Sequence, residues 1–221
     1  GARDLCATGI FKKYRVEAIF GLHLWPGLAK GQVFSRRKEM MSRSCEVHVR
    51  FTGKSAHIAK AYEGIDAMAA AVEFYRGVRA AEQALPADVF RVLNFGKFQS
   101  GAVCNAVAGE ASLDGTLRAF RDDVFFGLAE QIRRIAGEVA KATGCAVEVS
   151  MGDGYPAVYN PPELYDKVQA AAPFRELEAP SLITEDFSWY QRYLPGMFFF
   201  LGTGDSPALH NDRFDFPEDV L

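Results

Sequence analysis

Two histidines of this chain each lie within or just after an apolar segment, a placement that suits metal binding. His23 lies inside the apolar run 19–25, which ends at a Pro-Gly break, and His210 lies in the polar loop that follows a second apolar run, residues 198–201. A buried strand that ends at a turn delivers its side chains to a sheet edge, where sites usually form. Imidazole is the commonest nitrogen ligand of protein metals. Both histidines are therefore candidate metal ligands.

A histidine in an apolar strand has a second interpretation. It is often a core residue that hydrogen-bonds a backbone carbonyl, and spacing alone does not separate that role from metal binding. His48 differs, because it alternates with charged residues in the segment 44–51 and is expected to be a solvated surface histidine. Asp122 and Asp123 are expected to begin a helix and not to bind metal.

Five short motifs occur along the chain in a recognisable order. They are Phe20-Gly21-Leu22-His23-Leu24-Trp25-Pro26, Gly64-Ile65-Asp66-Ala67, Gly115-Thr116-Leu117-Arg118, Glu185-Asp186-Phe187-Ser188 and Leu209-His210-Asn211. With these motifs the chain resembles the dinuclear-metal amidohydrolases of the aminoacylase and carboxypeptidase superfamily, in particular the hippurate hydrolase and N-acyl-amino-acid deacylase branch. The resemblance covers nearly all 221 residues. It implies a zinc-peptidase-like α/β catalytic domain with an inserted ferredoxin-like domain.

The resemblance also implies roles for single residues. His23 and His210 match two ligands of a site that holds two divalent metals per subunit, and zinc, manganese, cobalt and nickel all suit such ligands. His57 matches a loop histidine that reaches over a dimer interface and stabilises the oxyanion in the partner's active site. Asn105 and Arg118 match residues that bind the substrate carboxylate or carbonyl, and the planar fork of an arginine grips a carboxylate with two bonds.

Some of these assignments have alternatives in the sequence. His57 could be an ordinary exposed loop histidine, and Arg118 a surface arginine of a strand. Glu185 and Asp186 could orient a metal-ligating histidine or begin a helix, and we favour a helix start with some orienting role. Relatives often carry a Pro-His pair where this chain has Ala61-Tyr62, so detailed substrate inference is weakened.

The family's general base and one of its metal ligands come from an adjacent Glu-Glu pair. This chain contains no two adjacent glutamates, and the family places the pair just upstream of the position equivalent to Gly1. The chain opens without methionine, inside a predicted helix, and relatives have a longer connection near 173–175. We therefore expect a piece of a longer protein, without its general base.

The elements that must position these residues follow from periodicity. Residues 44–152 are predicted to run strand, helix, strand, strand, helix, strand, which is the split βαβ pattern of a ferredoxin-like module. We expect this α/β (α+β) chain to form a discontinuous catalytic, metal-binding domain from 1–43 and 153–221, and a dimerisation or lid domain from 44–152. The alternating strands and the Ala-rich helix at 64–83 favour a homodimer.

The remaining predictions are local. Outside the inserted module we expect a helix over 3–14 weakened at Gly9, strands at 19–25, 31–35 and 198–204, a polar connector at 36–41, and helices at 162–172 and 185–193. Within the module we expect strands at 44–51, 89–99, 111–121 and 145–151, and helices at 64–83 and 122–143.

Composition excludes several classes of protein. Hydrophobic residues at 49% and charged residues at 24% are ordinary for a globular chain, and the net charge of −3 gives no sign of nucleic-acid binding. No apolar run approaches the ~20 residues of a membrane span. The four cysteines lack paired spacing, which favours reduced thiols of a cytosolic protein. The absence of a Gly-x-Ser-x-Gly elbow argues against a serine hydrolase.

The resemblance implies a metal-dependent amidohydrolase that cleaves the amide bond of N-acetyl or N-benzoyl amino acids, or of similar small amides. The chain in hand would be a fragment of it without the general base. The alternative is a catalytically inactive relative that acts as a binding or dimerisation protein. The upstream sequence, with or without the missing ligands and the Glu-Glu pair, distinguishes the two.

Overall fold

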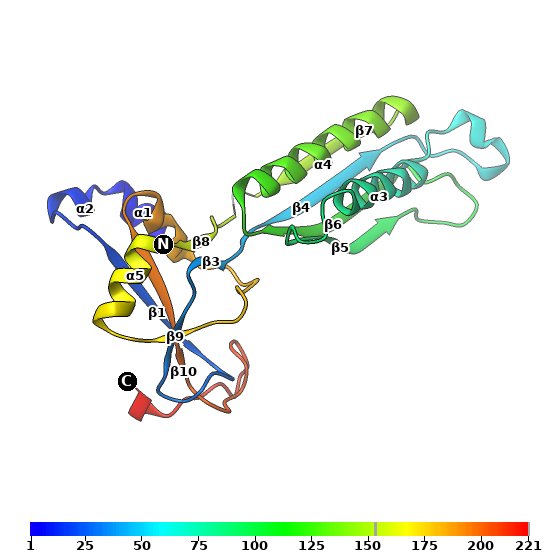
Figure 1. Ribbon diagram of the computed structural model, residues 1–221. Coiled ribbons are helices and arrows are strands. Elements are labelled where there is room, and N and C mark those ends of the chain that lie inside the picture. Colours follow the sequence, from blue (N-terminus) through cyan, green and yellow to red (C-terminus); the bar gives the residue numbers. More distant parts are fainter. Residues whose placement is uncertain (153, 221) are drawn as a thin grey trace. The chain divides into compact units, whose positions relative to one another are not determined.

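The computed structural model describes residues 1–152 and 154–220 and divides the chain into two compact units. Unit 1 comprises Gly1–Ser42 and Tyr155–Leu221, and unit 2 comprises Arg43–Gly154. Both combine helices with β-sheet, which confirms the predicted mixed α/β fold (Figure 1).

Unit 2 has the βαββαβ order that its periodicity predicted. Its four strands form an antiparallel sheet in the order β5-β6-β4-β7, and α3 and α4 lie on one face of it (Figure 1). The elements are β4 (Arg43–Thr52), the 3-10 helix η1 (Ile58–Glu63), α3 (Ala67–Gln83), β5 (Arg91–Ser100), β6 (Glu110–Ala119), α4 (Asp122–Thr143) and β7 (Ala146–Met151). This is the strand order of a ferredoxin-like sheet.

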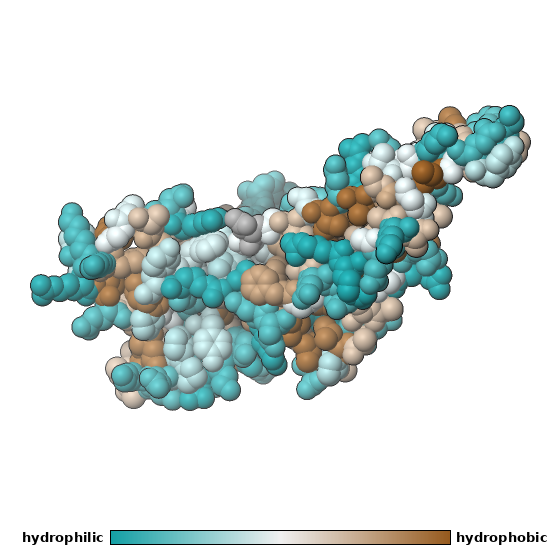
Figure 2. Space-filling view, turned by 90° about the horizontal axis from the view of Figure 1, so that it is seen from above, coloured by the Kyte–Doolittle hydropathy of each residue, from teal (hydrophilic) through white to brown (hydrophobic). Residues whose placement is uncertain are grey.

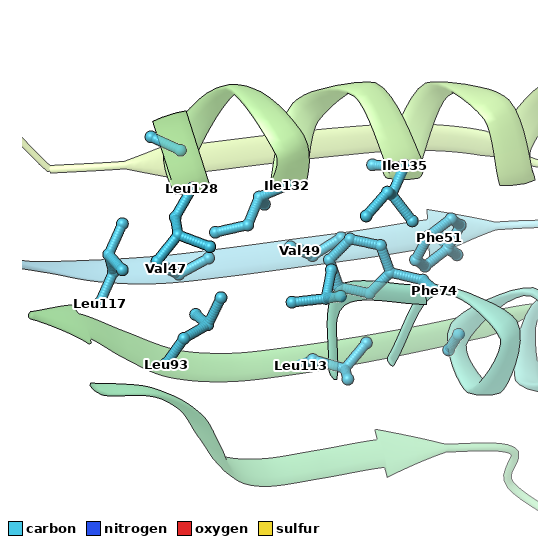
Figure 3. Close-up of a cluster of buried hydrophobic side chains, with 14 of the residues drawn as sticks. Val47, Val49, Phe51, Phe74, Leu93, Leu113, Leu117, Leu128, Ile132 and Ile135 are labelled. Carbon is cyan, nitrogen blue, oxygen red and sulfur yellow. The ribbon is translucent and has the colours of Figure 1, made fainter. Parts of the chain in front are cut away.

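The alternation of β4 decides which face of the sheet is buried. Its apolar side chains point toward the helices and are almost fully buried, while the intervening Glu46, His48 and Arg50 are exposed. Figure 3 shows Val47, Val49 and Phe51 of β4 in contact range of side chains from α3, α4, β5 and β6. The exposed position of His48 is the one its alternation predicted.

Local signals set the ends of the helices in unit 2. The predicted helix start at 64 was three residues too early, because Ile65 and Lys54 exchange two backbone hydrogen bonds of 2.9 Å and hold the chain extended. The carboxylate of Asp66 then accepts the N–H groups of Met68 and Ala69, which caps α3. At the other end of the unit, α4 stops as predicted at Gly144, whose φ of 78° is left-handed.

The Asp122-Asp123 pair lies in the first turn of α4, as a helix start requires, but neither residue is the N-cap, which is Arg121. The Asp122 carboxylate instead accepts a hydrogen bond of 2.9 Å from the buried Arg43 guanidinium.

Unit 1 is built around a four-stranded sheet of order β1-β10-β2-β9. Strands β1 and β10 are parallel neighbours, with His23 opposite Phe200. The elements are α1 (Ala2–Ala7), α2 (Ile10–Lys13), β1 (Ile19–Trp25), β2 (Val33–Ser35), β3 (Lys38–Met41), β8 (Val158–Asn160), α5 (Pro162–Ala171), β9 (Arg175–Glu176), and β10 (Gly196–Gly202), with 3-10 helices η2 (Asp186–Arg192) and η3 (Glu218–Val220). Gly9, with φ of 73°, separates α1 from α2 as predicted.

Two predictions for unit 1 were wrong or incomplete. The connector predicted at 36–41 contains β3, which pairs with β8 more than a hundred residues later in the chain. The helix predicted at 185–193 is the 3-10 helix η2. Short strands of this kind depend on distant partners and leave little periodicity in the sequence.

Asn160 joins the two sheets of unit 1. It is fully buried, its amide nitrogen donates to the Ser35 hydroxyl, the Arg36 carbonyl and the Phe198 carbonyl, and its amide oxygen accepts the Phe198 N–H at 2.9 Å. The network satisfies every polar atom of the Asn160 side chain and ties β8 to β10, the neighbour of the His23 strand.

None of the helices in the described part of the chain is long and apolar enough to cross a membrane.

Candidate functional site

His23 lies near the carboxyl end of β1 and is half-buried. Its Nδ1 lies 2.7 Å from the backbone carbonyl oxygen of Leu24. Because a carbonyl only accepts hydrogen bonds, Nδ1 carries the proton, and the lone pair of the neutral ring is on Nε2. Metal-ligating histidines commonly use their second ring nitrogen in this way. The bond to a carbonyl, which a core histidine also makes, leaves Nε2 able to bind a metal.

His210 lies in the loop that follows β10, where it is exposed and has a left-handed backbone with φ of 65°. Since β1 and β10 run parallel, the loop leaves the sheet at the edge where β1 ends. The Thr203 N–H donates to the Trp25 carbonyl at 3.1 Å and fixes the start of the loop against the end of β1. Both predicted metal ligands thus belong to unit 1. His23 lies near the carboxyl end of β1, and His210 lies in the loop that follows the carboxyl end of the adjacent parallel strand β10.

These residues fit a metal site only in part. Within residues 1–152 and 154–220, no group of three or more His, Cys, Asp or Glu side chains is arranged to hold a metal. Two imidazole nitrogens are half of the four ligands that a structural zinc takes, and fewer than the three protein ligands of a catalytic zinc. Any metal held by His23 and His210 requires further donors.

Glu185 and Asp186 lie at the start of η2, and both are half-buried. Burial raises the pKa of the Glu185 carboxyl above its ordinary value. The Phe187 N–H and the neighbouring His23 act in the opposite direction and offset part of this rise. Asp186 accepts the Ala2 N–H at 3.1 Å and so links η2 to α1. The predicted helix start at Glu185 and Asp186 is therefore confirmed, although the helix is 3-10. The Asp186 carboxylate also holds α1 in place, because it accepts the Ala2 N–H.

His57 lies in the exposed loop between β4 and η1 and is the N-cap residue of η1. Its Nδ1 accepts the Ala59 N–H at 3.2 Å. A ring nitrogen that accepts carries no proton, so Nε2 carries the proton of the neutral ring and is a hydrogen-bond donor. The tautomer of His57 is thus opposite to that of His23, and each suits a different task.

Asn105 lies in the loop between β5 and β6, where it is exposed. The Ile58 N–H donates to the Asn105 carbonyl at 2.9 Å, and His57 forms an antiparallel bridge with Ala106. Two predicted site residues from separate loops, His57 and Asn105, are therefore adjacent.

Arg118 lies elsewhere in unit 2. It is half-buried near the far end of β6, in register with Ser44 of β4, and on the sheet face opposite the helices. The Asn105 loop precedes the first residue of β6, Glu110. Eight strand residues at ~3.3 Å each put roughly 26 Å between the two ends. Arg118 and the Asn105 loop thus occupy opposite ends of β6.

The sequence analysis missed a hollow of about 510 Å³ in unit 2. It lies over the sheet face that carries Arg50, Gln99 and Ser112, and its walls include Ser55 and the Asn105-bearing loop. The Arg50 guanidinium donates to the Glu110 carboxylate at 2.8 Å at its edge. Arg50 is one of several charged residues on the solvated side of β4, so nothing in the alternation singles it out.

Comparison with known proteins identifies the family. The model of peptidase family M20/M25/M40 matches residues 1–221. The N-acetyldiaminopimelate deacetylase of Streptococcus suis is 31% identical over 230 residues, which cover the whole chain and 61% of that protein. An uncharacterized hydrolase of Staphylococcus haemolyticus is also 31% identical over 233 residues, with the same coverage. The chain thus spans about three fifths of the length of these relatives.

Solved structures show the same fold. A putative aminohydrolase from methicillin-resistant Staphylococcus aureus matches the whole chain with a TM-score of 0.89 and 21% identity, over 59% of its own length. The YXEP protein of Bacillus subtilis, a dinuclear metal binding peptidase of the M20 family, matches the whole chain with a TM-score of 0.76 and 25% identity, over 57% of its length. The resemblance drawn from the five motifs is confirmed: the chain belongs to peptidase family M20/M25/M40.

Proposed function

We propose that this chain is part of a metal-dependent amidohydrolase that cleaves the amide bond of N-acyl amino acids or similar small amides. The observation that carries the proposal is the pair of opposite histidine tautomers. His23 offers an Nε2 lone pair, as a metal ligand must, and His57 offers an Nε2–H, as an oxyanion donor must. Membership of the M20 family and the deacetylase named among its relatives support the same reaction class.

Amide hydrolysis requires a polarised carbonyl, an activated water and a proton for the leaving amine. When bound, two divalent metals would supply the first two requirements. In this chain His23 and His210 would each give an imidazole nitrogen to the metals, with the remaining ligands and a Glu-Glu pair contributed from outside residues 1–221. The dinuclear site named for the YXEP protein supports a pair of divalent ions.

The other predicted residues would bind the substrate. The Nε2–H of His57 would donate to the oxygen that becomes negatively charged when water attacks the carbonyl. The side-chain amide of Asn105, whose backbone is bonded to the same loop, would bind the carbonyl or carboxylate beside it. Arg118, at the opposite end of β6 from this pair, would grip with its planar fork the carboxylate of a substrate whose carbonyl is bound by His57 of the other subunit. Glu185 and Asp186 would keep η2 in place beside the His23 strand.

We further propose that unit 1 is a partial catalytic domain and that unit 2 is a dimerisation and lid domain, with two subunits per enzyme. Three side chains on the outer side of α3, at positions i, i+4 and i+7, are large, apolar and about two-fifths exposed: Met68 (44%), Val72 (40%) and Tyr75 (40%). Neighbouring β5 is an edge strand, and its Phe98, on the helix side of the sheet, is also exposed. An apolar helix stripe beside an open strand edge suits a two-fold interface.

The hydrophobic surface of unit 2 is visible in Figure 2, where brown areas interrupt the teal at the right of the view.

We propose a cytoplasmic location on the evidence of the cysteines. Cys6, Cys45 and Cys145 are buried and Cys104 is exposed, and all four are free thiols.

The full-length enzyme tests the proposed reaction. We expect it to hydrolyse an N-acyl amino acid with dependence on added Zn²⁺, Mn²⁺, Co²⁺ or Ni²⁺, and to lose activity to a chelator. His23→Ala should lower both bound metal and turnover, while His48→Ala, a matched change at a surface histidine, should leave both unchanged. A full-length protein that binds no divalent metal and hydrolyses none of these amides would favour the alternative, an inactive relative that acts as a binding or dimerisation protein.

A further inference from the structure

The loop that carries His57 ends in apolar side chains that no described residue of unit 2 covers. Tyr62 is 82% exposed and Ile58 52% exposed, both on η1, and Val103 on the adjacent Asn105 loop is 60% exposed. In Figure 1 this loop, in cyan, lies at one end of the unit 2 sheet. The three side chains are called the apolar tip below.

The base of the loop is ordered, so the exposure of the apolar tip is not the result of a loose chain. Lys54 and Ile65 close the base with two backbone hydrogen bonds of 2.9 Å, and the Val107 N–H donates to the Ala56 carbonyl at 2.8 Å. A Cβ on Gly64 would lie 2.9 Å from the Lys54 carbonyl oxygen, which shows how closely the two sides of the base approach. The backbone therefore presents Ile58 and Tyr62 outward.

The polar groups at the tip indicate what it contacts. His57, whose Nε2–H is a hydrogen-bond donor, directly precedes Ile58 in the sequence. The Asn105 backbone carbonyl accepts a hydrogen bond from the Ile58 N–H. A hydrogen-bond donor and an amide beside apolar side chains are complementary to a carbonyl that carries an apolar substituent. The two charged residues of η1, Lys60 and Glu63, instead form an ion pair with each other, with 3.8 Å between the Lys60 Nζ and a Glu63 carboxylate oxygen.

We infer that the apolar tip contacts the acyl group of the substrate, whose carbonyl oxygen accepts the hydrogen bond from His57. We also infer that Tyr62 makes the enzyme prefer an aromatic acyl group over acetyl. The inference rests on the proposed function, since it needs an N-acyl substrate. A benzoyl group buries its ring against Tyr62, Ile58 and Val103, whereas an acetyl group offers one methyl.

The test compares N-benzoyl-L-alanine with N-acetyl-L-alanine as substrates of the full-length enzyme. Tyr62→Ala should lower kcat/KM for the benzoyl substrate about tenfold and for the acetyl substrate less than about twofold. Tyr62→Phe should keep the wild-type ratio, because the ring and not the hydroxyl makes the contact. Tyr14→Ala, which removes a tyrosine of comparable exposure (65%) from unit 1, should leave both values unchanged.

Each other outcome is informative. An equal loss for both substrates, or no loss for either, overturns the role of the apolar tip while the amidohydrolase reaction stands. Conversion of the enzyme to monomers by Tyr62→Ala, measured by sedimentation, would assign the tip to a subunit contact and also overturn it. No hydrolysis of either substrate by metal-loaded wild-type enzyme would instead refute the proposed function itself.

Discussion

The Nδ1 of His57 accepts a hydrogen bond of 3.2 Å from the Ala59 N–H, two residues farther along the chain. A short 3-10 helix thus holds the ring and determines which nitrogen carries the proton. The resemblance implies that this histidine acts on the active site of a neighbouring subunit, whereas the structure places it only within unit 2.

Mixed dimers distinguish the two possibilities for His57. We expect His57→Ala and His23→Ala full-length enzymes each to lose about 10²–10³ or more in turnover. Co-expression should then restore up to about half of the wild-type activity per mixed dimer, because one site has both an intact His57 and an intact His23. No recovery in purified mixed dimers would make His57 a residue of its own subunit's site or a purely structural N-cap.

The 221-residue chain by itself should not hydrolyse amides. It contains no adjacent glutamate pair to act as base, and it offers His23 and His210 without a third ligand among the described residues. We expect no metal-dependent turnover of N-acetyl-L-alanine, and Zn²⁺ binding by calorimetry that is at least about 100-fold weaker than in the full-length enzyme. Robust turnover by the purified fragment would contradict the prediction.

A charge placed on α3 should separate the proposed dimer. Tyr75→Asp puts a carboxylate into the apolar stripe, and burying it unpaired costs several kcal/mol. We expect the full-length variant to sediment as a monomer at micromolar concentration, where the wild type sediments as a dimer. Tyr14→Asp in unit 1, an equivalent change at an exposed tyrosine, should remain dimeric. A dimeric Tyr75→Asp protein would place the interface elsewhere.

The outer face of the unit 2 sheet should respond to pH through His48. Its Nδ1 lies 2.9 Å from an Asp114 carboxylate oxygen and its Nε2 3.4 Å from one of Glu46, while Lys97 also binds Asp114 at 3.2 Å. The bond to Asp114 raises the pKa of His48 above its ordinary value, and the same bond lowers the pKa of Asp114.

A raised folded-state pKa means that protonated His48 contributes full stability below its ordinary pKa of 6.5 and loses it as pH rises through the raised value. Asp114 stays ionised throughout that range, because its own pKa is lowered. We expect His48→Ala to lower Tm by about 1–3 °C near pH ~5.5 and by less near pH ~9, with the difference reduced by salt. A Tm difference that grows with pH would have the wrong sign.

Asn160 should be essential to unit 1. Asn160→Ala leaves the buried Ser35 hydroxyl and Phe198 N–H short of partners, and we expect a loss of about 2–4 kcal/mol of unfolding free energy in urea. Asn94→Ala, at an exposed position of β5, should change it by less than about 0.5 kcal/mol. Equal effects of the two substitutions would mean that the network contributes little.

Much of the architecture was predictable from the sequence. The apolar run around His23 is a strand, the alternation of β4 fixes which side chains face the helices, and Gly144 marks the end of α4. Each of these features depends on a residue's own conformational preference or on its immediate neighbours, so it is legible in a short window. The family, too, was evident from five local motifs.

Tertiary structure alone decided the rest. Strands β3, β8 and β9 exist because of distant pairing, and η2 became a 3-10 helix where sequence periodicity predicted a longer one. His57 and Asn105 are 48 positions apart in the sequence and adjacent only because the Ile58 N–H finds the Asn105 carbonyl. The backbone carbonyl of Leu24 determines which ring nitrogen of His23 carries the proton, and strand β1 determines the orientation of that carbonyl. Hydrogen bonds are satisfied by whatever group the folded backbone brings within about 3 Å, and no local pattern encodes that group.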